Sequence, residues 1–305
     1  MSTTITSPDN DAQSADRRGG GGIVDAPPRI ASLQGARWRW KKLLSRPVKA
    51  TVLAVPLIYF LPKLSLFYAV CGIYDVARNR PITRDLLSKY FLGNGVFTWV
   101  MSPFNICLDI LALPYRNKGI YQLEDLPKPC QQELNQVLEA AVSGNLVKLL
   151  EEKVGNESRA MFFFKWYGDN VETDLQIPAF HDEYKYVKTI GVSVFRKRES
   201  TSKHFGFTRA SFRVLYNIND IHGRGAHIVV GSTDHYWSEN KLFIFDDTLL
   251  HQSFNESDES RYCMFIDIVR PSPVPSIMAL VMRVIHGLSR RFNWIFYKRW
   301  KLIRP

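Results

Sequence analysis

The chain has 305 residues, enough for one large domain or two smaller ones with a substantial core. Its formal net charge of +11 favours an anionic partner, such as nucleic acid, a membrane surface or an acidic ligand. The four cysteines lie far apart without a CxxC pair, which argues against a zinc ribbon or a disulfide scaffold and favours a reducing compartment.

The N-terminal segment 1–35 is rich in Ser, Asp and Gly. It offers little apolar surface to bury, so we expect a disordered tail. No cationic start followed by an apolar stretch opens the chain, and we therefore expect no cleaved signal peptide.

The next region, 36–118, combines positive charge with hydrophobicity and is expected to be membrane-associated. Its basic segment RWRWKKLLSRPVK (37–49) interleaves Arg and Lys with tryptophan, and apolar segments follow at 50–76 and 91–113. Both are about long enough to cross a bilayer core of roughly 30 Å. Charged residues and prolines interrupt them, namely Pro56, Pro62 and Lys63 in the first and Pro103 and Asp109 in the second.

Two readings of these apolar segments follow. Basic and aromatic residues flank the first segment as membrane anchors do, which favours a membrane-embedded hairpin. The alternative is a buried hairpin or a pair of segments in the interface. The polar linker between the segments is also basic, with Arg78, Arg80, Arg84 and Lys89. This charge makes a single span less plausible than re-entrant or paired segments.

Residues 119–275 have the pattern of a folded domain. Apolar spacing over 127–153 predicts amphipathic helices with a break at Ser143 and Gly144. Short apolar strands separated by turn residues are expected at 184–195, 211–218, 226–231, 241–246, 249–254 and 261–269. Regular short strands without intervening helices predict a mainly β fold, either a sandwich or a jelly roll.

The C-terminal segment 276–305 holds seven Lys or Arg and has apolar spacing near the helical period. We expect a basic amphipathic helix, either on an anionic membrane surface or packed on the domain with a solvated basic face. A nucleic-acid partner is disfavoured, because no recognised module and no basic groove lined with stacking aromatics occurs.

A jelly roll commonly holds a ferrous ion with histidines at the mouth of the barrel, and leaves positions open for a co-substrate and dioxygen. His204 and His251 lie on or beside separate predicted strands. Spacing alone favours this pair only weakly over the competing histidines, which are His181, His222, His227, His235 and His286.

Two longer motifs strengthen the choice of this pair. KHFGFTRASFRVLYNI (203–218) and WSENKLFIFDDTLLHQSFNESDESR (237–261) together resemble the aspartyl/asparaginyl β-hydroxylase family, whose members are iron(II)- and 2-oxoglutarate-dependent dioxygenases with a double-stranded β-helix fold. The resemblance covers about 160–271. Within the family, KWYGD (165–169) looks most like the bacterial membrane enzymes that hydroxylate acyl chains of lipid A or ornithine lipids.

The resemblance implies a set of site residues. His204 and His251 would be the iron ligands, and Arg261 would reach the distal carboxylate of 2-oxoglutarate with help from Ser193. Arg213 would contact the carboxylate next to the iron. Two further motifs are interpreted as structural. Asp246 and Asp247 would form the turn before the strand that carries His251. Trp237 would belong to a strand-and-turn signature.

Two positions depart from the expected pattern. Gly206 stands where many iron dioxygenases have the carboxylate of an H-x-D motif. The aspartyl/asparaginyl hydroxylases proper also have glycine there, whereas the lipid-acyl branch more often shows H-x-D. Leu215 stands where the family's R-x-H motif has a histidine. The loss of this histidine would weaken 2-oxoglutarate binding, or Arg213 or Asn217 would take over its contact.

The expected function is hydroxylation of an acyl chain of a membrane lipid by iron(II), 2-oxoglutarate and dioxygen. We expect the domain to face the cytoplasm at a bacterial inner membrane with an anionic surface, because reduced iron and 2-oxoglutarate are cytoplasmic metabolites. One alternative, supported by Gly206, is an aspartyl/asparaginyl hydroxylase of peptides or proteins. The other is a catalytically inactive membrane-associated binding module.

Overall fold

The computed structural model describes residues 48, 51, 55, 56, 58–155, 157–175, 177–290, 301 and 302. The predicted disordered tail at 1–35 and nearly all of the basic segment at 37–49 lie outside these residues. So does the part of the predicted C-terminal helix at 291–300.

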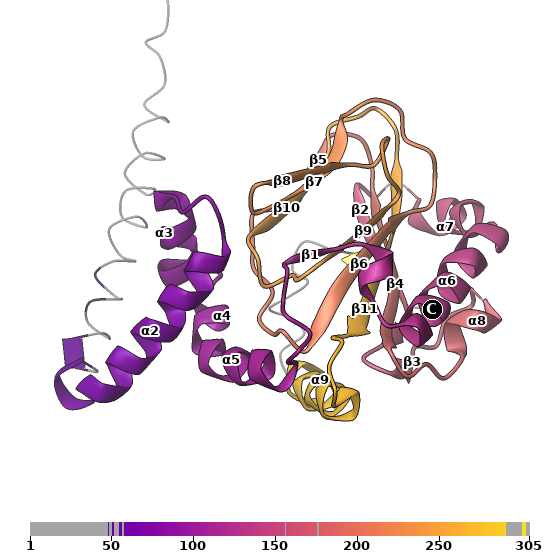
Figure 1. The fold of residues 1–305 in the computed structure, drawn as a ribbon. Helices are drawn as coiled ribbons and strands as arrows, with labels where there is room; N and C mark the ends of the chain where they lie inside the picture. The colour runs from indigo at the N-terminus through magenta and orange to yellow at the C-terminus, as the bar shows by residue number, and fades with distance from the viewer. Residues whose placement is uncertain are drawn as a thin grey trace, which may run out of the picture. The chain divides into compact units, whose positions relative to one another are not determined.

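Two facing sheets form the centre of the fold (Figure 1). The larger one has, in spatial order, β1 (Ile120–Tyr121), β9 (Leu242–Phe245), β6 (Ser211–Asn217), β11 (Arg261–Val269), β4 (Val187–Phe195), β2 (Arg159–Trp166) and β12 (Lys301–Leu302), and β3 (Asp169–Asn170) pairs with β2. The smaller one has β5 (Glu199–Ser200), β10 (His251–Asn255), β7 (Ala226–Val230) and β8 (Thr233–Tyr236). All strands expected from the sequence are present, and the pairing is antiparallel except for β12 with β2.

Strand β11 shows why the strands read as continuous apolar runs. Successive side chains of a strand point to opposite faces. Met264 and Ile266 pack in the apolar cluster beneath the helices, whereas Cys263 belongs to a second cluster between the sheets. That second cluster also contains Leu215 from β6 and Ile228 from the opposing sheet. Both faces of the larger sheet are therefore covered, and the mainly β jelly-roll architecture is confirmed.

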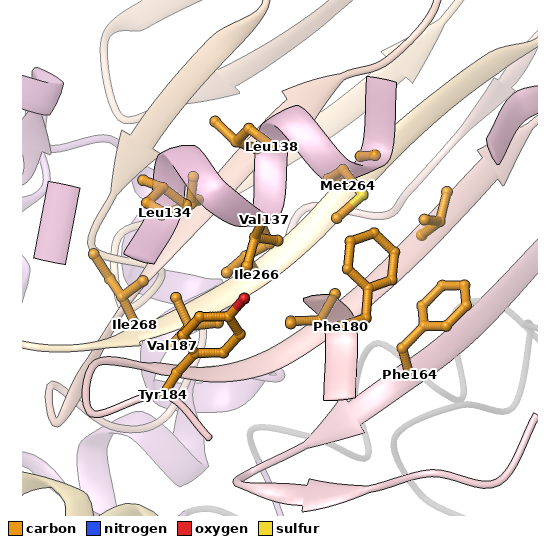
Figure 2. Packing of buried hydrophobic residues seen from close by; sticks show 14 of the residues in the cluster. Leu134, Val137, Leu138, Phe164, Phe180, Tyr184, Val187, Met264, Ile266 and Ile268 are labelled. Carbon is orange, nitrogen blue, oxygen red and sulfur yellow. The ribbon is translucent and has the colours of Figure 1, made fainter. Parts of the chain in front are cut away.

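Helices cover the outer face of the larger sheet. They are α6 (Lys128–Ser143), α7 (Leu146–Val154) and α8 (Pro178–His181), with η1 (Leu123–Asp125) just before α6. Figure 2 shows Leu134, Val137 and Leu138 of α6 packed over strand residues such as Ile266. The predicted break between α6 and α7 is confirmed, since Gly144 caps α6 and Asn145 turns the chain with a left-handed φ of 52°.

The C-terminal helix α9 (Pro275–Arg290) also packs on the domain over its described length. Met278 and Met282 are buried in the outer cluster, while Leu280 and Val284 are exposed. The helical prediction for 276–305 does not hold at its end, because Lys301 and Leu302 form a strand parallel to β2.

Helices α2 (Pro62–Arg78), α3 (Arg84–Leu92), α4 (Val96–Val100) and α5 (Ser102–Leu111) precede the jelly roll. We call α2–α5 the helical module. The apolar segment expected at 91–113 is divided between the end of α3, α4 and α5. Among the residues that the structure describes, no helix has the length and apolar character needed to span a bilayer.

Candidate functional site

A cavity of about 240 Å³ lies between the two sheets. Side chains from both sheets and from the loop before β6 line it. They include every residue that the sequence singled out as ligand or co-substrate contact, namely Ser193, His204, Arg213, His251 and Arg261. The competing histidines His181, His222, His227 and His235 are not among the lining residues, and the side chain of His286 lies outside the described part of the structure.

His204 and His251 face each other across a short backbone bridge. Each backbone N–H donates to the other residue's carbonyl at 3.0 Å, and the ring centroids lie 4.1 Å apart. Because residue 204 precedes β6 by several residues and residue 251 opens β10, this bridge is what brings them together.

Both imidazoles have the same tautomer. Nδ1 of His204 lies 2.7 Å from the carbonyl oxygen of Ser202, and Nδ1 of His251 lies 2.8 Å from that of Leu249. A carbonyl only accepts, so each Nδ1 carries the proton and each Nε2 keeps its lone pair. Burial lowers the pKa of both groups, and the neighbouring His204 lowers that of His251 further. Both rings are therefore neutral near pH 7, the form that binds a metal ion.

Arg261 is a buried cation without a matching anion. Its side chain is 2% exposed, and Nη1 donates to Ser253 Oγ at 2.8 Å. Its guanidinium lies 4.5 Å from the ring centroid of Phe195, while Nε is buried with no hydrogen-bond partner in the described chain. No carboxylate among the described residues lies within ion-pair distance, and burial lowers the pKa of Arg261. Since an uncompensated buried charge is costly, this end of the cavity favours an anionic ligand.

Ser193 lies close to Arg261. On the paired strands β4 and β11, Ser193 is opposite Cys263 and Arg261 is opposite Phe195, so both side chains point into the cavity. The Ser193 hydroxyl donates to the carbonyl of Cys263 at 3.2 Å. A hydroxyl and a guanidinium on neighbouring strands can together bind one carboxylate.

Arg213 differs from Arg261 because its charge is already balanced. Its Nε donates to Asp267 at 2.7 Å and its Nη2 to Asp247 at 3.0 Å, and its guanidinium lies 3.7 Å from the centroid of the Phe265 ring. These carboxylates hold the pKa of Arg213 above its ordinary range despite burial. The side chain lines the cavity as expected, and its described partners are two aspartates.

Asp247 is a site residue that the sequence reading placed only in a turn. Asp246 does form that turn, since its Oδ1 accepts from the backbone N–H of Thr248 at 2.9 Å. The carboxylate of Asp247 points instead into the cavity, where burial raises its pKa to about 7. The sequence signal that could have found it is the doubled aspartate, because only one of two adjacent strand-end residues can face outward.

Gly206 explains how Asp247 fits. A Cβ atom at position 206 would lie 2.3 Å from Oδ1 of Asp247, and the Gly206 N–H donates to the Asp247 carbonyl at 2.7 Å. The carboxylate of Asp247 thus occupies the space in which the side chain of an H-x-D motif would begin. Among the described residues no three His, Cys, Asp or Glu side chains gather as a metal-binding group, and the two imidazoles remain the candidate ligands.

The remaining positions that the sequence raised are more distant or apolar. Leu215 lines the cavity as an apolar residue, and Trp237 is buried among the apolar residues between the sheets, 5.5 Å by its ring centroid from the Arg261 guanidinium. Asn217 donates to the carbonyl of Asn219 rather than into the cavity. Asn217 therefore makes no described contact that would let it replace, in 2-oxoglutarate binding, the family histidine whose position Leu215 occupies.

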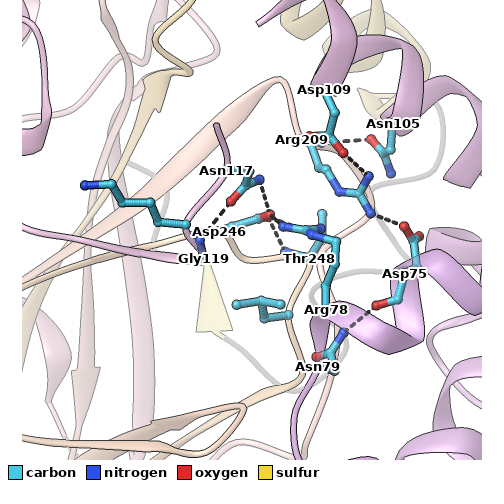
Figure 3. A network of polar contacts seen from close by, with 12 residues as sticks. Asp75, Arg78, Asn79, Asn105, Asp109, Asn117, Gly119, Arg209, Asp246 and Thr248 are labelled. Carbon is cyan, nitrogen blue, oxygen red and sulfur yellow. Dashed lines mark hydrogen bonds and ion pairs between the residues drawn. The ribbon is translucent and has the colours of Figure 1, made fainter. Parts of the chain in front are cut away.

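The helical module holds the loop that carries His204. Thr98 Oγ donates to the carbonyl of Gly206 at 2.7 Å, and Asn105 Nδ2 donates to that of Phe207 at 3.0 Å. Buried Arg209 pairs with Asp75 of α2 and with Asp109 of α5, as Figure 3 shows.

The module also holds the loop that carries Asp247 and leads to His251. Arg78 donates to Asp246 at 2.5 Å (Figure 3). The Leu250 N–H donates to Asn79 Oδ1 at 2.7 Å. Despite burial, the Arg78 charge holds the pKa of Asp246 below its usual range. The segments that carry His204 and His251 are therefore both anchored to the helical module.

Comparisons with known proteins cover this region. Residues 130–271 match the family model described as "Aspartyl/Asparaginyl beta-hydroxylase". A stretch of 41 residues is 39% identical to an ornithine lipid ester-linked acyl 2-hydroxylase from Rhizobium tropici, covering 13% of this chain. This chain spans only 15% of that relative's length. The family match includes both histidines and Arg261.

Solved structures with a similar arrangement have little sequence in common with the chain. A cupin 2 conserved barrel domain protein from Salinispora arenicola is 15% identical with a TM-score of 0.23, covering 32% of this chain and 71% of its own. A predicted oxalate decarboxylase from Thermotoga maritima is 11% identical with a TM-score of 0.24, covering 28% of this chain and 68% of its own.

Proposed function

Because the jelly-roll domain of this chain belongs to the aspartyl/asparaginyl β-hydroxylase family, we propose that it is an iron(II)- and 2-oxoglutarate-dependent dioxygenase that hydroxylates an acyl chain of a membrane lipid. The reaction would convert a C–H bond of the lipid to C–OH. One atom of dioxygen enters the lipid, the other enters succinate, and 2-oxoglutarate loses carbon dioxide.

The observation that supports 2-oxoglutarate as the co-substrate is the unpaired guanidinium of Arg261. A 2-oxoglutarate molecule would bring its distal carboxylate to this cation and to the Ser193 hydroxyl, which relieves the cost of burying Arg261 alone. A planar guanidinium accepts a carboxylate with two parallel hydrogen bonds, which fixes the orientation of the rest of the molecule.

His204 and His251 would hold the metal through Nε2. Their Nδ1–H groups are fixed by backbone carbonyls, so the rings need no reorientation to bind an ion. The bound ion with dioxygen and 2-oxoglutarate supplies the oxidising chemistry, while the protein supplies binding and orientation.

Asp247 would act beside the metal rather than on the co-substrate. Arg213 Nη2 holds its Oδ2, which leaves Oδ1 facing the space beside Gly206. With a pKa of about 7, this carboxyl can accept a hydrogen bond from a cavity water or hold a proton at Oδ1. Arg213, which is itself held by Asp267, fixes the orientation of Asp247.

An acyl chain suits the mouth of this cavity. Large apolar side chains make up much of the lining, and they include Met161, Trp166, Phe205, Phe207 and Phe265. Burying hydrocarbon against them is favourable by about 25 cal/mol per Å². The small similarity to the ornithine-lipid hydroxylase supports the same substrate class. We further propose that the enzyme works at an anionic membrane surface with its catalytic domain on the cytoplasmic side.

A peptide or protein substrate is the second candidate. Gly206 favours it, because the aspartyl/asparaginyl hydroxylases proper share glycine at this position. The two candidates differ in the product, so one experiment separates them.

That experiment incubates the purified chain with iron(II), 2-oxoglutarate and dioxygen. Ornithine lipid, lipid A or peptides containing Asp and Asn are offered in parallel. We expect succinate release that depends on lipid, and a lipid product heavier by one oxygen atom. The variant His251→Ala should release no succinate. His235→Ala is its matched control, because His235 also contacts a backbone carbonyl but lies outside the cavity. Hydroxylation of peptide alone would overturn the lipid assignment, and no succinate with any substrate would overturn the activity.

A further inference from the structure

Three helices of the helical module, α2, α4 and α5, bury polar side chains and expose large apolar ones, whereas α3 buries Leu86 and Tyr90 in the ordinary way. On α2, Asp75 is buried while Leu66 and Ile73 are 67% and 64% exposed. On α4, Thr98 is buried while Phe97 is 59% exposed, and on α5 Asn105 is buried while Ile110 is 62% exposed. An amphipathic helix of a globular protein in water shows the opposite arrangement.

Helix α6 of the same chain shows the ordinary arrangement. Its Leu134, Val137 and Leu138 are buried, and its Gln136 and Glu139 are exposed. The inverted pattern is therefore a property of α2, α4 and α5 and not of the whole protein.

The exposed apolar surface is concentrated on this part of the chain. All but five of the large apolar side chains that the structure shows exposed lie between 55 and 115. The exceptions are Val48, Val142, Ile277, Leu280 and Val284. Exposed apolar side chains concentrated in this way mark an interaction site.

The polar inner side has its own partners. Asp75, Thr98, Asn105 and Asp109 bond to the loop that carries His204, as described above. These bonds explain why the polar residues face inward. They do not explain the apolar side chains on the outer side, which require an apolar partner.

The charge around the outer side identifies that partner. Among the described residues 58–118, the exposed charged side chains are Lys63, Arg80, Arg84, Arg116 and Lys118, the last of which pairs with Asp125, against the single exposed acid Asp85. The other two acids of this range, Asp75 and Asp109, face the jelly roll. Apolar side chains flanked by basic ones fit the interface of a membrane with anionic lipids.

We propose that the helical module docks in the interface of a lipid membrane through this apolar side. The occupant is the lipid itself, with basic side chains on anionic headgroups. Since the opposite side of the module anchors both metal-ligand segments, docking holds the cavity next to the lipid. This proposal deepens the proposed function and rests on it only for the nature of the substrate.

The test measures vesicle binding without turnover. Full-length chain without added iron is floated with vesicles of phosphatidylcholine, alone or mixed with anionic phosphatidylglycerol. Runs at ~0.5 M salt suppress the contribution of the basic segments, because the Debye length falls to about 4 Å. We expect the chain to float with both vesicle types at high salt, and more strongly with anionic vesicles at low salt.

The variant carries Leu66→Glu, Ile73→Glu, Phe97→Glu and Ile110→Glu, and should bind at least tenfold more weakly at high salt. Val142→Glu is the control, because Val142 is 56% exposed on α6, and it should bind like the unaltered chain. The α2 pair and the α4–α5 pair are also made separately, so that a loss can be measured in a variant whose folding is verified by circular dichroism.

Three outcomes would overturn the docking proposal. They are no flotation of the unaltered chain, equal flotation of the fourfold variant at high salt, or a self-association that the variant abolishes without any vesicle binding. Vesicle binding by a chain that, once loaded with iron(II), releases no succinate with any substrate would instead refute the proposed reaction. Hydroxylation of detergent-dissolved lipid by a chain that does not bind vesicles would refute only the docking.

Discussion

Replacing Arg261 by methionine should have opposite effects on ligand binding and on stability. The change removes the guanidinium and keeps most of the side-chain volume. Loss of one partner of a buried, hydrogen-bonded charge pair costs about 2–5 kcal/mol. We therefore expect the dissociation constant for 2-oxoglutarate to rise by a factor of roughly 30 to 4,000, at 1.4 kcal/mol per factor of ten.

The ligand-free protein should behave differently. Arg261 is 2% exposed and lacks a carboxylate partner among the described residues, so its removal relieves a buried charge. Replacing buried ionic groups by apolar ones stabilises by up to about 4 kcal/mol. Loss of the bond to Ser253 offsets about 1 kcal/mol, which leaves a change between roughly zero and 3 kcal/mol of added stability.

Two assays measure these quantities. Anaerobic calorimetry of the iron(II)-loaded protein gives the affinity for 2-oxoglutarate, and denaturant unfolding of the metal-free protein gives stability. Arg270→Met is the matched control, since Arg270 is as deeply buried but pairs with Asp109 at 2.6 Å. It should destabilise the protein and leave the affinity for 2-oxoglutarate unchanged. An unchanged affinity in Arg261→Met would refute the assignment of the anion site.

Four other expectations follow. His204→Ala and His251→Ala should each abolish iron binding and turnover, as measured by metal content and succinate release; full activity in either would exclude that ligand. Gly206→Ala should cost about 1–3 kcal/mol of stability, because its Cβ would overlap the carboxylate of Asp247, and the added change Asp247→Ala should restore much of it in denaturant titrations. Burial raises the pKa of Asp247 to about 7, so its contribution to stability is present below about pH 4 and is lost as the pH rises through about 7. Relative to the variant Asp247→Asn, the metal-free protein should lose on the order of 2–4 kcal/mol of stability over that range. Parallel curves of stability against pH for the two proteins would contradict this. Thr98→Val should lower iron affinity and cost about 1–3 kcal/mol by leaving the Gly206 carbonyl without its donor, whereas Thr98→Ser should retain both properties.

The sequence predicted the strands well because each has a clear local signal. Alternation of side chains and turn residues between apolar runs define β4, β6 and β11 without knowledge of their partners. The short strands were not predicted, since two residues such as those of β1 and β12 become strands only through pairing with a neighbour.

The candidate site was predicted from motifs more than from physical patterning. His204, His251 and Arg261 came from their spacing in a familiar arrangement, and the structure brings them into one cavity. The position of Asp247 and the two carboxylate partners of Arg213 depend on contacts between β6, β11 and the loop before β10. The doubled aspartate at 246 and 247 is a local signal for one inward carboxylate, but no local signal identifies Arg213 as its partner.

The apolar segments at 50–76 and 91–113 show a different limit. Hydropathy reports how apolar a segment is, but not which of its faces turns outward. Prolines and polar residues divide the second segment, and Thr98 and Asn105 turn inward to the loop that carries His204. Only the tertiary contacts distinguish this inverted arrangement from an apolar hairpin.

The most direct test of the proposed reaction follows oxygen atoms. The iron(II)-loaded chain is incubated with 2-oxoglutarate, membrane lipid and isotopically heavy dioxygen, and lipid and succinate are analysed by mass spectrometry. The account predicts one heavy oxygen atom in the hydroxylated acyl chain, one in succinate, and loss of both in Arg261→Met at low 2-oxoglutarate. A product that carries oxygen from water, or a lipid that remains unmodified while peptide is hydroxylated, would contradict it.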